Sequence, residues 1–231
     1  MNFGTPTAQQ IQLEQANFIA KVYTWMSAAL IITGLTAMWV ASSPTLIGLV
    51  VGNRLVFFGL IIGELILVSY LAAAVHRMSA DMAMLGFLFY ALLNGFTLSV
   101  LFVAYTQASI ASTFFITAGT FAAMSAYGYF TKKDLTSIGN LLFMALIGLI
   151  IATVVNWFLK NELIYWITTF AGVLIFVGLT AYDTQRIKNM NIIGNEGTEE
   201  DKKEAILGAL ILYLDFINLF IYLLRLLGQR K

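Results

Sequence analysis

Cysteine is absent from this chain of 231 residues, which also has only two prolines and one histidine. Without cysteine, the protein forms no disulfide, holds no iron–sulfur cluster and performs no thiol catalysis. One histidine and no cysteine also exclude the ligand sets of zinc hydrolases. Both prolines lie outside the long apolar stretches, so proline-broken helices are not available for building an ion site.

Charge is scarce as well. Charged residues make up 11% of the sequence and hydrophobic residues 60%, whereas about 25% of an ordinary soluble domain is charged. No basic stripe with interleaved aromatic residues is present to bind nucleic acid. These proportions indicate a protein of the lipid bilayer, and we expect no resident cofactor.

The chain repeats apolar stretches of about twenty residues, the length that a helix needs to cross about 30 Å of hydrocarbon. We therefore predict an all-α membrane protein with seven transmembrane helices. They form a single domain over 22–231, which follows a polar cytoplasmic segment over 1–21. The predicted spans are 22–41, 55–75, 82–104, 110–130, 138–158, 163–185 and 205–226.

The positions of lysine and arginine predict the orientation, because positive residues are retained on the cytoplasmic side. With seven spans, eight of the thirteen lie on the side of the N-terminus, which we predict to be cytoplasmic. The basic end of the last span would suit the cytoplasm if that segment were re-entrant, so the side of the C-terminus stays open. The other five, on the opposite side, are Arg54, Lys160, Arg225, Arg230 and Lys231.

Three carboxylates fall inside the predicted spans: Glu64, Asp183 and Asp215. Each costs about 2.5–3.5 kcal/mol at a helix centre, so such residues usually face the interior of the bundle and are paired. Asn218 and Tyr222 follow Asp215 at i+3 and i+7, which places the three polar groups on one helical face. This set is our candidate site. The alternative is that each acid is neutral and only hydrogen-bonds to a neighbouring helix.

The two aspartates would form a switch if their carboxyl groups meet. Asp183 lies near the predicted cytoplasmic edge and Asp215 ~15 Å inside its span, so contact requires the last helix to start deeper or to tilt. Two carboxylates within hydrogen-bonding distance in a low dielectric share a proton and titrate together near neutral pH. Such a pair would also bind calcium, which takes oxygen ligands. Arg77 is a candidate partner of Asp183 at the cytoplasmic mouth.

Enzymes and receptors of the membrane fit the sequence less well, and we expect no enzyme. A retinal protein needs a lysine in its last helix, and residues 205–226 contain none. An intramembrane aspartyl protease would have a glycine-rich surround at its second aspartate, which Asp215 lacks. A serine–histidine protease would need His76 deep in a helix, whereas it lies at the predicted edge of one.

Two strings around the aspartates resemble the Bax-inhibitor family of membrane proteins. They are AYDTQ over 181–185 and LYLDFINLF over 212–220, the second followed by Leu223, Leu224 and Arg225. The string KKDL over 132–135 and the pair Asn94 and Gly95 are also similar to that family. The resemblance extends from about residue 22 to the end, and its nearest members are the bacterial inner-membrane ones.

The resemblance implies a fold in which six helices surround a central C-terminal helix, and a pH-regulated calcium leak across the inner membrane. It implies that Asp183 and Asp215 share a proton and sense pH, while we predict Glu64 and Asn218 as accessory residues lining the path. The family's latch arginine falls on Val75 here, which makes Arg77 a displaced substitute. Because family members are also associated with cell survival and with a membrane-bound protease, the alternative function is a non-conducting membrane regulator.

Overall fold

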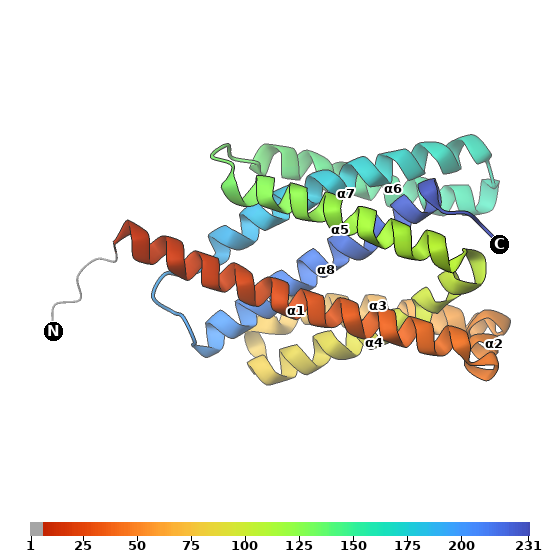
Figure 1. Ribbon diagram of the computed structural model, residues 1–231, viewed down its shortest axis with the longest axis horizontal. Helices are drawn as coiled ribbons and strands as arrows, with labels where there is room; N and C mark the ends of the chain where they lie inside the picture. The colour runs from red at the N-terminus through yellow and green to blue at the C-terminus, as the bar shows by residue number, and fades with distance from the viewer. Residues whose placement is uncertain (1–6) are drawn as a thin grey trace. The chain divides into compact units, whose positions relative to one another are not determined.

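The computed structural model describes residues 7–231, and those residues are almost entirely helical (Figure 1). Seven of the helices described are long and apolar enough to cross a membrane. These findings confirm the prediction of an all-α membrane protein with seven transmembrane helices. The elements are α1 (Ala8–Ser42), α2 (Pro44–Gly52), α3 (Arg54–Ala74), η1 (Val75–Arg77), α4 (Ala80–Ala104), α5 (Gln107–Phe130), α6 (Thr136–Leu159), α7 (Glu162–Met190) and α8 (Glu199–Leu227).

Three helices extend beyond their predicted spans into polar segments of the chain. Thr7 caps α1 and forms a capping box with Gln10, so the polar residues from 8 to 21 extend the first span as one continuous helix. The first six residues of the predicted segment 1–21 lie outside the described residues. Helix α7 runs five residues past its predicted end, and α8 begins at Glu199, six residues before its predicted start.

The short helix α2 was not predicted, although its start signals are in the sequence. The Ser43 side chain accepts a hydrogen bond from the backbone N–H of Leu46, and Pro44 occupies the first helical turn. Both features are typical of helix N-termini. With nine residues, α2 is too short to cross the bilayer and forms part of the connection between α1 and α3.

The contacts of the chain divide into two compact units. Unit 1 holds the residues up to Val100 and those from Ile187 to Ile211; unit 2 holds those from Leu101 to Arg186 and from Leu212 to Lys231. The first half of α8 therefore belongs to unit 1 and the second half to unit 2. The single domain over 22–231 and the central position of the last helix stay predictions.

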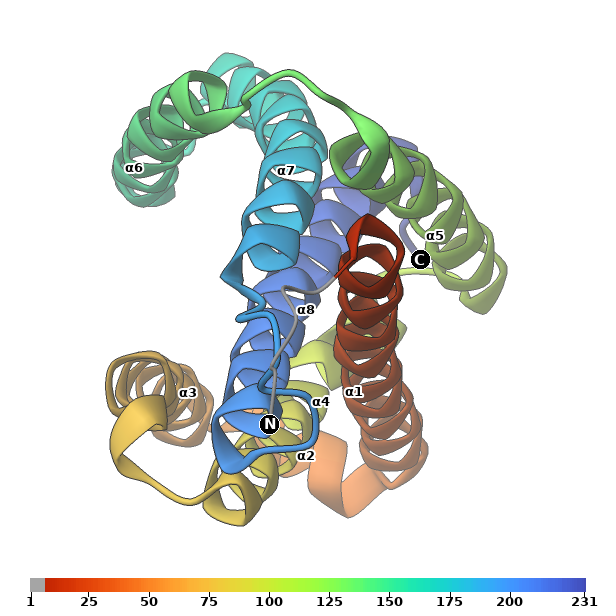
Figure 2. The ribbon, with the colours of Figure 1, turned by 90° about the vertical axis from the view of Figure 1, so that its left-hand side faces the viewer.

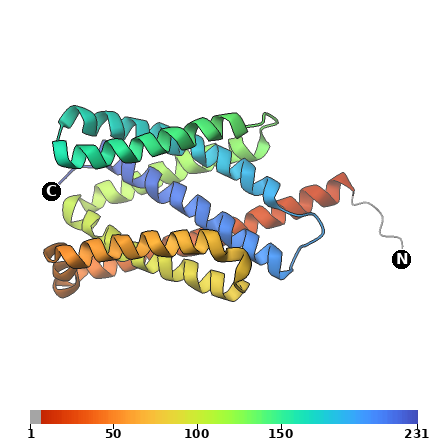
Figure 3. The same cartoon turned by 180° about the vertical axis from the view of Figure 1, so that it is seen from behind.

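Unit 1 packs α1, α3 and most of α4 closely. The Thr33 hydroxyl of α1 donates a hydrogen bond of 2.8 Å to the Ala91 carbonyl oxygen of α4. At Gly95, a Cβ atom would come within 2.6 Å of the Thr36 Cβ atom, so glycine permits the close approach of α1 and α4. Figure 3 shows α3 and α4 side by side, where Gly86 of α4 contacts Leu71 of α3.

Within unit 1, an ion pair holds the start of α8 against α1. The Asp201 carboxylate, whose side chain is 2% exposed, accepts a bond of 2.8 Å from the Lys21 ammonium group. It also accepts one of 2.8 Å from the backbone N–H of Gly197 in the preceding turn. A buried carboxylate is stabilised by a cation and an amide donor, so this contact holds the first turn of α8 against α1.

Replacing Asp201 by alanine is expected to lower the free energy of unfolding by about 1–3 kcal/mol, because the hydrogen bonds that its charged carboxylate accepts from Lys21 and Gly197 are lost. The neighbouring Glu200 is exposed and its ion pair with Lys203 is long, at 3.9 Å. Its replacement by alanine should change stability by less than about 0.5 kcal/mol. Thermal unfolding of the two variants in detergent checks the difference. Equal stabilities would mean that the Lys21–Asp201 contact does not hold α8.

Unit 2 packs α6, α7 and the second half of α8 around an apolar cluster. Its buried members include Leu149 of α6, Phe176 of α7 and Leu219 of α8. Figure 2 shows α6 and α7 side by side, where Gly178 of α7 contacts the Leu142 side chain of α6. The outer faces of these helices carry exposed leucine, isoleucine and phenylalanine side chains, as expected where lipid replaces water.

Candidate functional site

Helices α7 and α8 pass each other in a register that brings the two aspartates to the same level. The Phe176 ring stacks on the Tyr222 ring, with centroids 5.8 Å apart and planes 24° apart. Asp183 follows Phe176 by seven residues, and Asp215 precedes Tyr222 by seven residues. Seven residues are two helical turns, so in this antiparallel pair both aspartates lie two turns from the ring stack. The register therefore allows the contact between Asp183 and Asp215, which the sequence predicted only if the last helix started deeper or tilted.

The carboxyl groups of Asp183 and Asp215 hydrogen-bond to each other inside unit 2. The two residues are 4% and 5% exposed. Two buried oxygens of the pair, Oδ1 of Asp183 and Oδ2 of Asp215, accept no hydrogen bond from an N–H or hydroxyl group of the described protein. Two acids so close and so buried do not both ionise without a counterion. The pair therefore has the geometry to hold one shared proton, or to offer two oxygens to a cation.

The residues before Asp183 are packed against glycines, which fixes the course of α7. Ala181 lies against Gly128 of α5, and a Cβ atom at Gly128 would overlap the Ala181 carbonyl oxygen. The Tyr182 ring lies against Gly139 of α6, where a Cβ atom would overlap the ring. Because neither glycine has a side chain, α5 and α6 pack closely against the two residues before Asp183. This packing holds Asp183 in place.

The residues after Asp183 are fixed by hydrogen bonds. The hydroxyl groups of Thr184 and Ser125 of α5 lie 2.7 Å apart and hydrogen-bond. The Gln185 side chain accepts from the Leu135 backbone N–H at 2.9 Å and donates to the Lys133 carbonyl oxygen at 2.8 Å. Each residue of AYDTQ therefore has a packing or hydrogen-bonding partner in unit 2, and together these contacts hold the Asp183 carboxyl group in position.

The α5–α6 turn that receives Gln185 is itself capped. Asp134 accepts hydrogen bonds from the hydroxyl group and the backbone N–H of Thr136, at 2.6 and 2.9 Å. These bonds favour the charged form and hold the pKa of this exposed carboxyl below its ordinary value. The family-like string KKDL therefore serves to shape this turn.

Arg186 is the cation next to Asp183, and it was not among the predicted site residues. Its Nη1 lies 3.8 Å from Oδ1 of Asp183, at the i+3 position of the same helix, and its side chain is half-exposed. The i,i+3 spacing is the signal that predicts such a pair. At 3.8 Å in partial contact with solvent, this attraction is modest, so Arg186 is a weak competitor for the Asp183 oxygen.

Arg77, the predicted latch, lies in unit 1, where it is exposed at the end of η1. Its pairing with Asp183 stays a prediction, whereas the ion pair formed within unit 2 uses Arg186. Val75, at the family's latch position, is 2% exposed. It lines a small apolar space of unit 1 together with Leu71 and Phe87, so a valine suits its surroundings there.

Glu64 forms a separate polar cluster with three residues of α4 in unit 1. It accepts a hydrogen bond from the Thr97 hydroxyl and one of 3.4 Å from Nδ2 of Asn94, which also lies 3.5 Å from the Tyr90 hydroxyl. Tyr90, Asn94 and Thr97 follow the helical spacing i, i+4, i+7. That spacing marks a polar face of α4 that could have been recognised in the sequence. The place of Glu64 on an ion path stays a prediction.

Asn218 lies one turn beyond Asp215 and is half-buried. Its Nδ2 donates a bond of 2.8 Å to the Leu214 carbonyl oxygen of its own helix. The amide donor is therefore used locally, and its role beside the pair stays a prediction. No group of three or more histidine, cysteine or acidic residues able to hold a metal occurs in the part of the chain described. Since calcium takes six to eight oxygens, the two carboxyl groups alone do not complete a calcium coordination shell.

Comparison with known proteins gives matches over nearly the whole chain. The profile of a family described as "Inhibitor of apoptosis-promoting Bax1" matches residues 15–231. The inner membrane protein YbhL of Escherichia coli strain K12 is 51% identical over 215 residues, which cover 93% of this chain and 92% of that protein. An uncharacterized protein of Borreliella burgdorferi is 43% identical over 227 residues, covering 98% and 97%. The profile match contains both aspartates and the whole AYDTQ string.

Proposed function

Because this chain belongs to the Bax-inhibitor family, we propose that it is a pH-regulated calcium leak channel of the bacterial inner membrane, with a cytoplasmic N-terminus. The observation that carries the proposal is the buried pair of Asp183 and Asp215. Its carboxyl groups hydrogen-bond to each other, and one buried oxygen of each has no N–H or hydroxyl donor in the described protein.

Protons and calcium compete for the same oxygens in this mechanism. When the pair holds one shared proton, its net charge is only −1, and a cation must break the hydrogen bond between the carboxyl groups before it can bind both. When the proton leaves, two negative oxygens face each other at close range and attract a divalent cation. The deprotonated pair passes the ion, so calcium flux rises with pH through the range in which the pair titrates.

The apolar surroundings support this competition. Phe216, next to Asp215, packs its ring against Phe114 and Phe121 of α5, with centroids 5.5 and 5.4 Å away. The pair itself is buried, and a low dielectric strengthens the interaction between charges. A small change in protonation then produces a large change in the attraction for calcium.

Calcium flux into liposomes that contain the purified protein tests the proposal. We expect flux to rise between pH 6 and pH 8, by about tenfold if the loss of a single proton near neutral pH controls entry. Asp215→Asn is expected to remove most of that flux at the higher pH, because the amide keeps the shape of the side chain and loses its charge.

Asp81→Asn is the matched control, because Asp81 is an exposed carboxylate in the first turn of α4. Its flux should equal that of the wild type. Unchanged flux in Asp215→Asn, with normal thermal stability, would contradict the proposal. No calcium flux through the wild-type protein at any pH would favour a non-conducting regulator instead, for example of a membrane-bound protease.

A further inference from the structure

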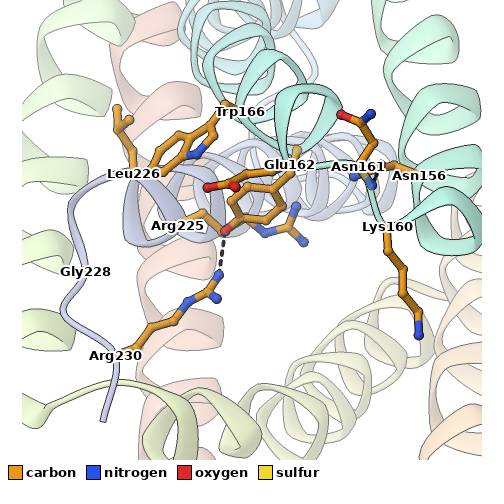
Figure 4. Close-up of a pocket in the computed structure, with 10 residues that line it drawn as sticks. Asn156, Lys160, Asn161, Glu162, Trp166, Arg225, Leu226, Gly228 and Arg230 are labelled. Carbon is orange, nitrogen blue, oxygen red and sulfur yellow. Dashed lines mark hydrogen bonds between the residues drawn. The ribbon is translucent and has the colours of Figure 1, made fainter.

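Unit 2 contains a second polar feature, a cleft of about 570 Å³ where α6 ends, α7 begins and α8 ends. This volume is within the range of about 300–1,000 Å³ that is typical of small-molecule sites. Figure 4 shows Lys160 and Arg230 on opposite sides of the opening, with Arg225 and Glu162 between them. The cleft therefore brings together charged groups from three segments of the chain.

The charge in this cleft is predominantly positive. Its lining contains the cations Lys160, Arg225 and Arg230 and one carboxylate, Glu162, so three positive charges less one negative charge leave an excess of two. None of the four ion pairs found among the described residues includes any of these groups. Like charges held in one cleft repel each other and create a positive potential that attracts anions.

The location makes this excess unusual. Positive residues are normally few on the non-cytoplasmic side of a membrane protein. Of the five on the side predicted to be non-cytoplasmic, three line this one cleft. The dipoles at the C-terminal ends of α6 and α8 favour nearby cations by about 0.3–1 kcal/mol each. That effect accounts for Lys160 and Arg225, whereas Arg230 lies beyond the end of α8 and needs another reason.

The backbone at Lys160 is held in a left-handed conformation, with φ 50° and ψ 37°. It is the one non-glycine residue with positive φ in the described part of the chain. Glycine is the usual residue where a helix ends in this conformation, and another residue there costs about 1 kcal/mol. Such conformations are enriched at functional sites, and the side chain here supplies a cation to the cleft.

Arg230 is placed by the chain around it. Its guanidinium group donates a bond of 2.7 Å to the Tyr165 hydroxyl, shown as a dashed line in Figure 4. Hydrogen bonding to Tyr105, together with the nearby Tyr165, raises the pKa of Arg230 above its ordinary value, so it stays charged. Backbone bonds from Thr106 to Gln229 and from Lys231 to Ala104, of 3.1 and 3.0 Å, hold the tail on both sides. The cation is therefore pre-positioned.

Aromatic side chains place the cleft at the depth of the lipid headgroups. Trp166 lines it, and both Trp166 and Trp157 of the preceding helix are exposed near the ends of their spans. Tryptophan is enriched at this level of membrane proteins. Phosphate groups are the most abundant anions there, and arginine binds phosphate oxygens in a two-pronged manner that matches their geometry.

We propose that this cleft is a phosphate-binding site, in which Lys160, Arg225 and Arg230 bind the phosphate group of an anionic phospholipid or of a soluble phosphate. The two sources share the same recognition chemistry. The arginine guanidinium groups contact the phosphate oxygens, the Lys160 ammonium group adds charge, and Glu162 disfavours a second anion. The site is separate from the aspartate pair, so its test does not depend on calcium conduction.

The experiment follows the thermal unfolding of the full chain in detergent micelles during two titrations. One adds short-chain phosphatidylglycerol, with phosphatidylcholine as its control, and the other adds inorganic phosphate, with chloride at equal ionic strength as its control. A ligand that binds the folded state raises the unfolding temperature in a saturable way. Saturation by phosphatidylglycerol alone identifies a lipid headgroup, whereas saturation by inorganic phosphate identifies a soluble source.

Lys160→Gly and Arg230→Gln are each expected to weaken the saturable binding by about tenfold, the effect of one charge-assisted hydrogen bond. Lys160→Gly should be at least as stable as the wild type without ligand, because glycine relieves the left-handed backbone. Arg54→Gln removes an exposed cation of unit 1 on the same predicted side and should leave binding unchanged. Equal binding in all three variants, or no saturation by either probe, would overturn the proposal.

Discussion

Replacing Gly128 by alanine is expected to lower the free energy of unfolding by about 3 kcal/mol, the upper part of the range for overpacking. A Cβ atom at this position would overlap the carbonyl oxygen of Ala181 and crowd its carbonyl carbon and Cα atom. These are backbone atoms in the middle of a helix, so no side-chain rotation relieves the overlap. Helices α5 and α7 must separate, and Asp183 moves with α7.

Gly119→Ala is the matched control on the same helix. A Cβ atom at Gly119 would meet no atom within 4 Å outside its own helix. Alanine is a better helix former than glycine by about 1 kcal/mol, so this variant should be as stable as the wild type or more stable. Thermal unfolding of both variants in one detergent measures the difference. If Gly128→Ala is no less stable than Gly119→Ala, α5 and α7 do not pack in the way described.

The sequence predicts the spans well because their signal is physical and local. A helix must be about twenty residues long to cross the bilayer, and charged or turn-forming residues interrupt that length. The starts of α1 and α8 were predicted too late, because their first turns are polar. Hydropathy does not indicate a helix in these polar turns. The helices are stabilised there by caps and by contacts such as the one between Lys21 and Asp201.

The site was predictable in its residues and less so in its geometry. Buried acids in apolar segments identify Asp183, Asp215 and Glu64 because each is costly in a membrane. The level at which Asp183 meets Asp215 depends on the register of α7 against α8, which the stacked rings of Phe176 and Tyr222 set across 46 residues of chain. No local pattern encodes that distance.

The partners of Glu64 show the same limit in another form. Thr97 and Asn94 lie 33 and 30 residues away from it in the chain. Their helical spacing with Tyr90 identifies a polar face of α4, but it does not say which helix that face contacts. That choice depends on which side chains fit together in unit 1, where Gly86 admits Leu71 of α3.

Removing either aspartate is expected to abolish most of the pH response of calcium flux, and removing both is expected to add little. In a coupled pair the titration belongs to the two groups together. Asp183→Asn and Asp215→Asn each leave a single carboxyl group beside an amide donor, with no second negative charge to oppose its ionisation. We expect flux to change by less than about twofold between pH 6 and pH 8 in either variant, against about tenfold in the wild type.

The double variant separates a pair from two independent sites. Independent sites have additive effects, whereas groups that act as a unit show a large interaction energy in a double-mutant cycle. Arg186→Gln should keep a pH response, because it removes a neighbour 3.8 Å from Asp183 and leaves both carboxyl groups in place. If the two single variants each lose half of the pH response and their effects add, the proposal of a shared proton is wrong. The aspartates would then act as two separate acids.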